Sequence, residues 1–198
     1  MILMVNRITL LKELQKYPVF GVRIVSNLID KGRNYSKLYI YRLKKAGLIL
    51  ELEKDRYTTH NDSLLVASHI VWPCYMSSWS AIRYYNLTEQ LPNHIEVITT
   101  RSRKRRELSF RNTTIKFIRI KRENFFGFGK IQHGDFEIFI AEKEKALADA
   151  LYLKHLSFET FIEILYNNHK ELDVKKLKIY LVKMAIKNIA KKLKEADI

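Results

Sequence analysis

Residues 33–59, RNYSKLYIYRLKKAGLILELEKDRYTT, contain the pattern that decides the fold of the first third of the chain. Four apolar positions recur there at helical spacing: Tyr39, Ile40, Leu43 and Ala46. The predicted helix ends at Gly47, after which residues 48–53 alternate as a strand. Lys54-Asp55 is a tight turn, and residues 56–59 return as the partner strand. The stretch therefore predicts a helix followed by a two-stranded hairpin.

Two shorter helices are expected before this stretch. Ile8, Leu11 and Leu14 indicate the first, and Pro18 stops it. Val22, Val25, Leu28 and Ile29 indicate the second, which we expect to end at Lys31-Gly32 with glycine in a left-handed conformation. Arg33-Asn34-Tyr35 is then a turn, and Ser36 or Asn34 caps the third helix. Three helices and a hairpin are the plan of a winged helix-turn-helix, which we place at residues 1–60.

The third helix carries polar residues on an outward stripe that can enter a major groove. The expected contacts to bases and phosphates come from Arg33, Ser36, Lys37, Tyr41 and Lys44. At the hairpin, Lys54 and Arg56 are placed to contact the minor groove or the backbone. The alternative is that the lysines only solvate a small helical domain.

The positive charge of the chain is unevenly distributed. The formal net charge is +15, of which residues 1–60 contribute 12 basic against 5 acidic side chains. Residues 61–100 hold one basic and three acidic residues, and residues 101–122 hold ten basic and one acidic. Two separated basic segments favour two contact surfaces for a polyanion, although an organism-wide composition bias remains an alternative.

The densest basic run lies between two predicted strands and is too polar to pack. It comprises Arg101, Arg103, Lys104, Arg105 and Arg106, with Ser102 between the first two. We expect an exposed loop that extends the DNA footprint through phosphate contacts. An acidic protein partner, or a solvated loop without a partner, is the alternative.

Residues 61–198 are predicted to form an α+β domain with a helical C-terminal part. Helices are expected after Asn61 or Asp62 and after Ser77-Ser78, followed by a small mixed or antiparallel sheet with strands at 95–99, 114–120 and 136–140. Further helices are predicted at 142–153, 158–166, 174–184 and 186–193. The last is basic and amphipathic, and it either packs on its own domain or meets a partner or membrane surface.

Composition excludes several classes of protein. The single cysteine, Cys74, excludes a disulfide framework, and no apolar run is long enough to span a membrane. Residues 1–5 are too short for the apolar core of a signal peptide. We therefore expect a cytoplasmic protein without membrane contact.

Features expected of enzymes are weak. The six histidines lack metal-ligand spacing, and residues 126–130 contain glycines without a complete phosphate-binding pattern, so we predict a turn there. No catalytic residue, metal or cofactor is expected. The alternative is a metal-dependent nuclease in which Asp135, Glu137 and Glu142 hold Mg²⁺, although these carboxylates fit surface ion pairs better.

Two motifs resemble a known family. Ser77-Ser78-Trp79-Ser80-Ala81 is followed by a tyrosine, then Leu87-Thr88-Glu89-Gln90-Leu91-Pro92 and the strand at 95–99. About fifty residues later comes Ala141-Glu142-Lys143-Glu144-Lys145-Ala146-Leu147-Ala148-Asp149. This order resembles the AbiE-type antitoxins, which are abortive-infection transcriptional regulators, over roughly residues 5–155. Asn86 departs from the glycine that the family commonly has.

The resemblance implies a two-part regulator. Its winged helix would bind inverted repeats in its own promoter and repress the operon. Its C-terminal domain would counteract a nucleotidyltransferase-like toxin encoded alongside, as in a type IV toxin–antitoxin system, without a stable antitoxin–toxin complex. A homo-oligomer is compatible with this arrangement, and the tail after about residue 155 has no counterpart in the resemblance.

Overall fold

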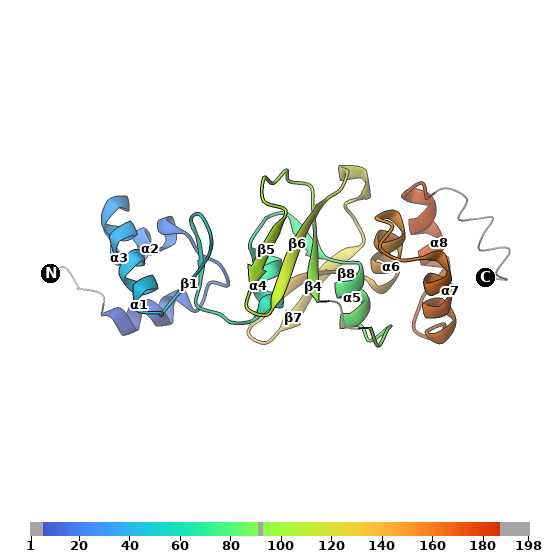
Figure 1. The fold of residues 1–198 in the computed structure, drawn as a ribbon, viewed down its shortest axis with the longest axis horizontal. Coiled ribbons are helices and arrows are strands. Elements are labelled where there is room, and N and C mark those ends of the chain that lie inside the picture. The colour runs from blue at the N-terminus through green and yellow to red at the C-terminus, as the bar shows by residue number, and fades with distance from the viewer. Residues whose placement is uncertain (1–5, 91–92, 187–198) are drawn as a thin grey trace. The chain divides into compact units, whose positions relative to one another are not determined.

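A computed structural model describes residues 6–90 and 93–186 of the chain. Those residues form a mixed α+β fold with eight α helices and two sheets, as the sequence predicted at this level (Figure 1). The chain divides into two compact units, Met1–Ile70 and Val71–Ile198. This division follows α4 (Ser63–His69) and lies ten residues beyond the boundary predicted between residues 60 and 61. Of the predicted features, residues 1–5, Leu91-Pro92 and the helix after Ile186 lie outside the described residues.

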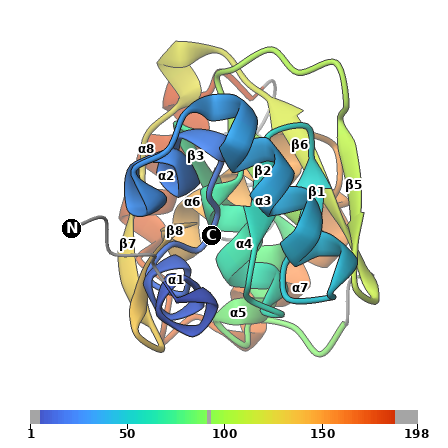
Figure 2. The ribbon, with the colours of Figure 1, turned by 90° about the vertical axis from the view of Figure 1, so that its left-hand side faces the viewer.

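The first unit begins with three helices and an antiparallel hairpin (Figure 2): α1 (Arg7–Leu14), α2 (Val22–Ile29), α3 (Arg33–Lys45), β1 (Leu50–Glu53) and β2 (Arg56–Thr58). Their apolar side chains form one core, made of Leu10, Leu14, Phe20, Val22, Val25, Ile40, Leu43 and Ile49. Reciprocal backbone hydrogen bonds join Phe20 to Tyr57 of β2, with N···O distances of 2.9 and 2.8 Å. Asp55, in the hairpin turn, accepts a 2.7 Å hydrogen bond from the backbone N–H of Val22. The hairpin is therefore fixed against the start of α2.

The turn between α2 and α3 is shorter than the sequence predicted. Asp30 ends α2 in the left-handed conformation (φ 51°), the role expected of Gly32. Aspartate tolerates this conformation because its short polar side chain can hydrogen-bond locally. Gly32 is instead the extended N-cap of α3. The predicted turn at residues 33–35 is consequently the first turn of α3, and Ser36 lies inside the helix instead of capping it.

The second unit is built on a six-stranded mixed sheet: β3 (Cys74–Met76), β4 (His94–Thr99), β5 (Glu107–Phe110), β6 (Thr113–Arg119), β7 (Phe128–His133) and β8 (Phe136–Ala141). Its strand order is β5-β6-β4-β3-β8-β7, with β4–β6 and β3–β8 parallel and the other neighbours antiparallel. The sequence predicted only β4, β6 and β8.

The turn predicted at residues 126–130 is wrong from Phe128 onward, where β7 begins. Gly127 immediately precedes β7 with φ 67°. A Cβ atom there would lie 3.1 Å from Cγ of Lys145, so the glycine permits a close approach to that side chain.

Four helices complete the second unit: α5 (Trp79–Tyr84), α6 (Lys143–Tyr152), α7 (Phe158–Asn167) and α8 (Val174–Lys183); a short 3-10 helix, η1 (Arg122–Asn124), follows β6. α6 contacts α5, α7, α8 and β8, and Figure 1 shows it between the sheet and the last two helices. Because neighbours cover it on several sides, every residue from 144 to 150 is buried. Three of these, Glu144, Lys145 and Asp149, are ionisable and must be satisfied internally.

Candidate functional site

Five of the residues predicted to contact DNA line one hollow of about 310 Å³ in the first unit: Arg33, Lys37, Tyr41 and Lys44 on α3, and Lys54 at the hairpin turn. The four helical residues are spaced by four, four and three positions, so they share one side of α3. All five are exposed, and Tyr41 keeps 56% of its surface. We call this set the α3–hairpin face.

A carboxylate lies beside this face. Nζ of Lys44 is 2.6 Å from Oε2 of Glu51, on the first strand of the hairpin. This hydrogen bond and the charge of Glu51 raise the pKa of Lys44 above its ordinary value, so the lysine is cationic at neutral pH. Arg56, also predicted as a contact, is exposed at the start of β2, and its guanidinium donates to the carbonyl of Asp55 at 2.9 Å.

Ser36 does not belong to the face, and its predicted contact with DNA is wrong. The residue is fully buried. Its hydroxyl donates to the carbonyl oxygens of Gly32 and Lys31, at 3.1 and 3.3 Å. The cause is the early start of α3, which turns this position toward the core of the unit.

The basic run 101–106 joins β4 to β5 in the second unit. Arg101, Arg103 and Arg106 line a second hollow, of about 750 Å³, with Lys116 and Arg119 of β6. We call it the basic hollow. Lys104 and Arg105 are exposed and are not among its lining residues.

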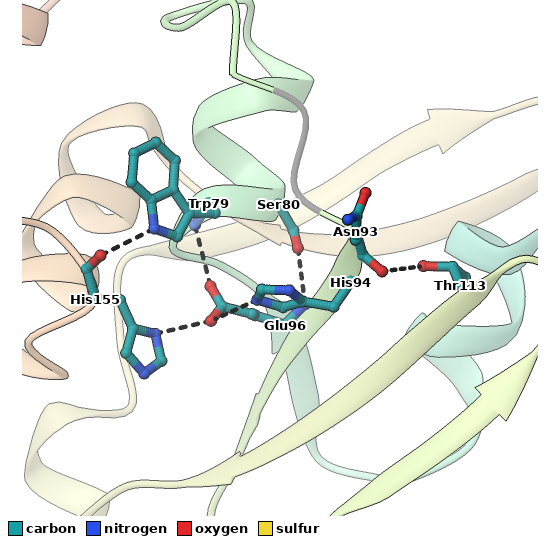
Figure 3. A network of polar contacts seen from close by, with 7 residues as sticks. All are labelled: Trp79, Ser80, Asn93, His94, Glu96, Thr113 and His155. Atoms are coloured by element: carbon teal, nitrogen blue, oxygen red, sulfur yellow. Dashed lines mark hydrogen bonds and ion pairs between the residues drawn. The ribbon is translucent and has the colours of Figure 1, made fainter.

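A polar network that the sequence analysis missed borders the basic hollow (Figure 3). Glu96 of β4 is only 2% exposed, and its Oε1 lies 2.8 Å from Nδ1 of His155 and 3.3 Å from Nε2 of His94. Its Oε2 accepts a hydrogen bond from the backbone N–H of Trp79 at 3.2 Å. The Trp79 indole donates to the carbonyl of His155, and Ser80 accepts from the backbone N–H of Glu96.

Only part of this network could have been predicted from the sequence. Glu96 lies in the strand predicted at 95–99, and His94 directly precedes that range. The two residues are two positions apart, which places them on the same side of β4. His155 is 59 positions beyond Glu96, in the segment that follows α6. A search for spacing within one element could not have joined it to the other two.

The structure brings the two family-like motifs together. The Ser77 hydroxyl donates to Oδ2 of Asp149 at 2.7 Å, and the Tyr75 hydroxyl donates to the same oxygen at 3.1 Å. Nζ of Lys145 pairs with Oδ1 of Asp149 and lies 3.1 Å from the Tyr75 hydroxyl. Burial raises the pKa values of Tyr75 and Asp149 and lowers that of Lys145. We call these four residues the buried tetrad.

The carboxylates of the nuclease alternative are not brought together. Asp135 is in the β7–β8 turn, and Glu137 pairs with Lys130 at 2.7 Å. Glu142 follows the other end of β8, roughly 17 Å along the strand from Glu137 at about 3.3 Å per residue. It accepts from Tyr180 at 2.6 Å. Among residues 6–90 and 93–186, no three His, Cys, Asp or Glu side chains are grouped to hold a metal ion.

No protein-family model matches the chain, and no curated protein matches it. Within the part of the chain that the structure describes, no helix combines the length and apolar character needed to cross a membrane.

Proposed function

We propose that this chain is a sequence-specific DNA-binding transcriptional regulator whose first unit acts as a winged helix-turn-helix. The observation that carries the proposal is the α3–hairpin face, in which four cations and a tyrosine lie around one hollow. An exposed helix with these side chains can enter a major groove about 12 Å wide and donate to bases and phosphates. Arg56, exposed on the second strand of the hairpin, would contact the backbone or the minor groove.

The wider proposal is that the regulator is the autoregulating antitoxin of a toxin–antitoxin pair, acting against a nucleotidyltransferase-like toxin. Support comes from the resemblance of the two motifs and from their joining in the buried tetrad. A chance pair of similar segments has no reason to supply partners for one buried polar cluster. Co-expressing the neighbouring reading frame with and without this chain tests the point, because rescue of growth should require the chain.

DNA binding is tested on duplexes from the region upstream of the chain's own gene, with shuffled duplexes as reference. Lys37→Ala removes a cation from the α3–hairpin face, and about 1–3 kcal/mol is expected for one base contact. Specific affinity should therefore fall about 5- to 150-fold. A variant that keeps full affinity would contradict the assignment of α3 as the recognition helix.

Lys45→Ala is the matched control. Lys45 is an exposed lysine of the same helix but lines a different hollow, with Arg7, Tyr39 and Arg42. Its removal should change specific affinity less than about twofold. If both variants weaken specific and shuffled duplexes equally, the helix contributes only general attraction between charges.

A further inference from the structure

The basic hollow has the size and lining of a small-molecule site. Its volume, about 750 Å³, falls within the roughly 300–1,000 Å³ of typical ligand pockets. Its walls come from β4, the following loop, β6, the start of α5 and His155 after α6. Side chains far apart in the sequence thus converge on one concave surface of the second unit.

The charge of the lining points to an anion. Five cationic side chains line the hollow against two carboxylates, Glu96 and Glu107. Among the described residues, no ion pair joins Arg106, Lys116 or Arg119 to a carboxylate. Concave surfaces with an excess of one charge concentrate the opposite charge, and guanidinium groups match the oxygens of a phosphate.

The basic loop is held in place by contacts with the sheet. The Arg103 guanidinium lies 4.0 Å from the centre of the Phe117 ring. The backbone N–H of Phe117 donates to the carbonyl of Arg106 at 2.7 Å. Nε of Arg101 donates to the carbonyl of Trp72 at 3.2 Å. A loop fixed in this way loses less conformational entropy when it binds a ligand than a freely moving basic segment would.

The Glu96 network supplies an oriented polar group to the same hollow. Glu96 is buried, and it engages Nδ1 of His155, a residue that also lines the hollow. Figure 3 shows the other ring nitrogen of His155 directed away from Glu96. A carboxylate that holds one imidazole nitrogen orients the ring so that the other can meet a ligand oxygen. A loop that is merely solvated does not account for the pairing of a buried carboxylate with this imidazole.

We propose that the basic hollow binds the phosphate group of a small organic phosphate, such as a nucleoside monophosphate or diphosphate. Arg106, Lys116 and Arg119 contact the phosphate oxygens, and His155 contacts an oxygen of the same ligand. This assignment is independent of the DNA-binding proposal, since it concerns the second unit alone. It also gives the run 101–106 a different ligand from the duplex DNA that the sequence analysis expected it to contact.

Trp79 lines the hollow, so its fluorescence can follow binding in the full-length chain. The probes are inorganic pyrophosphate, adenosine 5′-monophosphate and a 12-base-pair duplex without 5′-phosphates, with calorimetry as a second readout. We expect saturable binding of pyrophosphate and the nucleotide with Kd of about 1 mM or tighter. Both affinities should fall about tenfold or more in Arg106→Ala and in Lys116→Ala.

Lys130→Ala is the matched control, because Lys130 is an exposed lysine of β7, at the opposite edge of the same sheet. It should bind both phosphates as the unchanged chain does. Equal weakening in all three variants would reduce the effect to overall charge and overturn the proposal. So would the absence of saturable binding at 10 mM probe, or a loss of duplex binding in Arg106→Ala without any response to pyrophosphate. If Lys37→Ala lost duplex binding but still bound both phosphates, this result would support separate sites for DNA and phosphate.

Discussion

The α3–hairpin face and the basic hollow are both rich in cations, but different groups lie beneath them. The apolar side chains of Val22 and Ile40 underlie the first. Its neighbouring carboxylates are Glu51, which is exposed, and Asp55, which is partly buried and lines the hollow. The second borders a buried carboxylate that orients an imidazole. A cationic surface over an apolar core suits an extended polyanion, which needs little beyond charge and shape. A hollow with an oriented polar group suits a small ligand whose atoms must be placed individually.

The largest expected effect comes from removing a member of the buried tetrad, which belongs to the same unit as the basic hollow. Asp149→Ala leaves the buried ammonium of Lys145 without its partner, and breaking such a pair costs about 3–5 kcal/mol. Both tryptophans, Trp72 and Trp79, belong to the second unit, so tryptophan fluorescence in a urea titration reports on that unit. Glu163→Ala, at an exposed position of α7, is the control. A loss below about 1 kcal/mol would mean that the buried tetrad contributes little.

A smaller effect defines the edge of the α3–hairpin face. Ser36→Ala removes the hydroxyl that donates to the carbonyls of Gly32 and Lys31 just before α3, and we expect a loss of about 1 kcal/mol in unfolding free energy. Specific DNA affinity should stay within about twofold, because the hydroxyl is buried. Circular dichroism during urea unfolding and anisotropy with the upstream duplex measure the two quantities. A large loss of affinity in a folded variant would return Ser36 to the contact surface.

Removing the charge of Glu51, beside the α3–hairpin face, should increase the affinity for duplex DNA. Glu51→Gln removes the ion pair with Lys44, so that the lysine is available to phosphates. Exposed pairs of this kind are worth up to about 1 kcal/mol, which corresponds to a two- to fivefold gain in duplex affinity. Glu13→Gln, on α1, breaks a comparable exposed pair with Lys16 and should leave affinity unchanged. Unchanged binding in Glu51→Gln would show that Lys44 does not contribute to DNA binding.

The smallest expected effect is a loss of unfolding free energy of the second unit at acid pH, caused by protonation of Glu142. Burial raises the pKa of this carboxyl, but hydrogen bonds from Tyr180 and Lys176 lower it more, so the folded value lies below the ordinary 4.5. The stabilisation is therefore complete above the unfolded pKa and is lost as pH falls through the folded one. Because the side chain is 39% exposed, less than about 1 kcal/mol is expected.

Urea midpoints measured by tryptophan fluorescence between pH 3 and pH 7 test this dependence. Glu142→Gln should flatten it, whereas Glu163→Gln, at an exposed position of α7, should not. An identical pH profile for the Glu142 variant and the unchanged chain would contradict the assignment.

Periodicity predicted most of the helices, because their stripes of Leu, Ile and Val are regular. It missed β3, β5 and β7. β3 has only three residues, β5 follows directly after the basic run, and β7 begins within a glycine-containing stretch. It also misplaced the start of α3, because Asp30 and not Gly32 takes the left-handed conformation. Because of this error of a few residues, Ser36 was predicted to contact DNA, whereas it is buried.

The two candidate sites also differ in how far the sequence alone could predict them. Arg33, Lys37, Tyr41 and Lys44 could be grouped from the sequence because they share one helix, and their spacing alone places them on one side. The basic hollow could not, because Glu96, Arg106 and His155 meet only through the packing of β4, the basic loop and the segment after α6. Charge runs indicated that anions would be attracted, but not the form of the anion.

The parallel pairing of β3 with β8 has a consequence for synthesis of the chain. Met76 pairs with Ile140, which is 64 residues later in the chain, so the middle of this sheet cannot be completed until β8 has left the ribosome. Tyr75 and Ser77 bond to Asp149, so the tetrad needs more than seventy further residues. The core of the first unit spans only Leu10 to Ile49. Because domains generally fold as units during elongation, N-terminal first, we expect nascent chains to acquire a folded α3–hairpin face well before the tetrad is assembled.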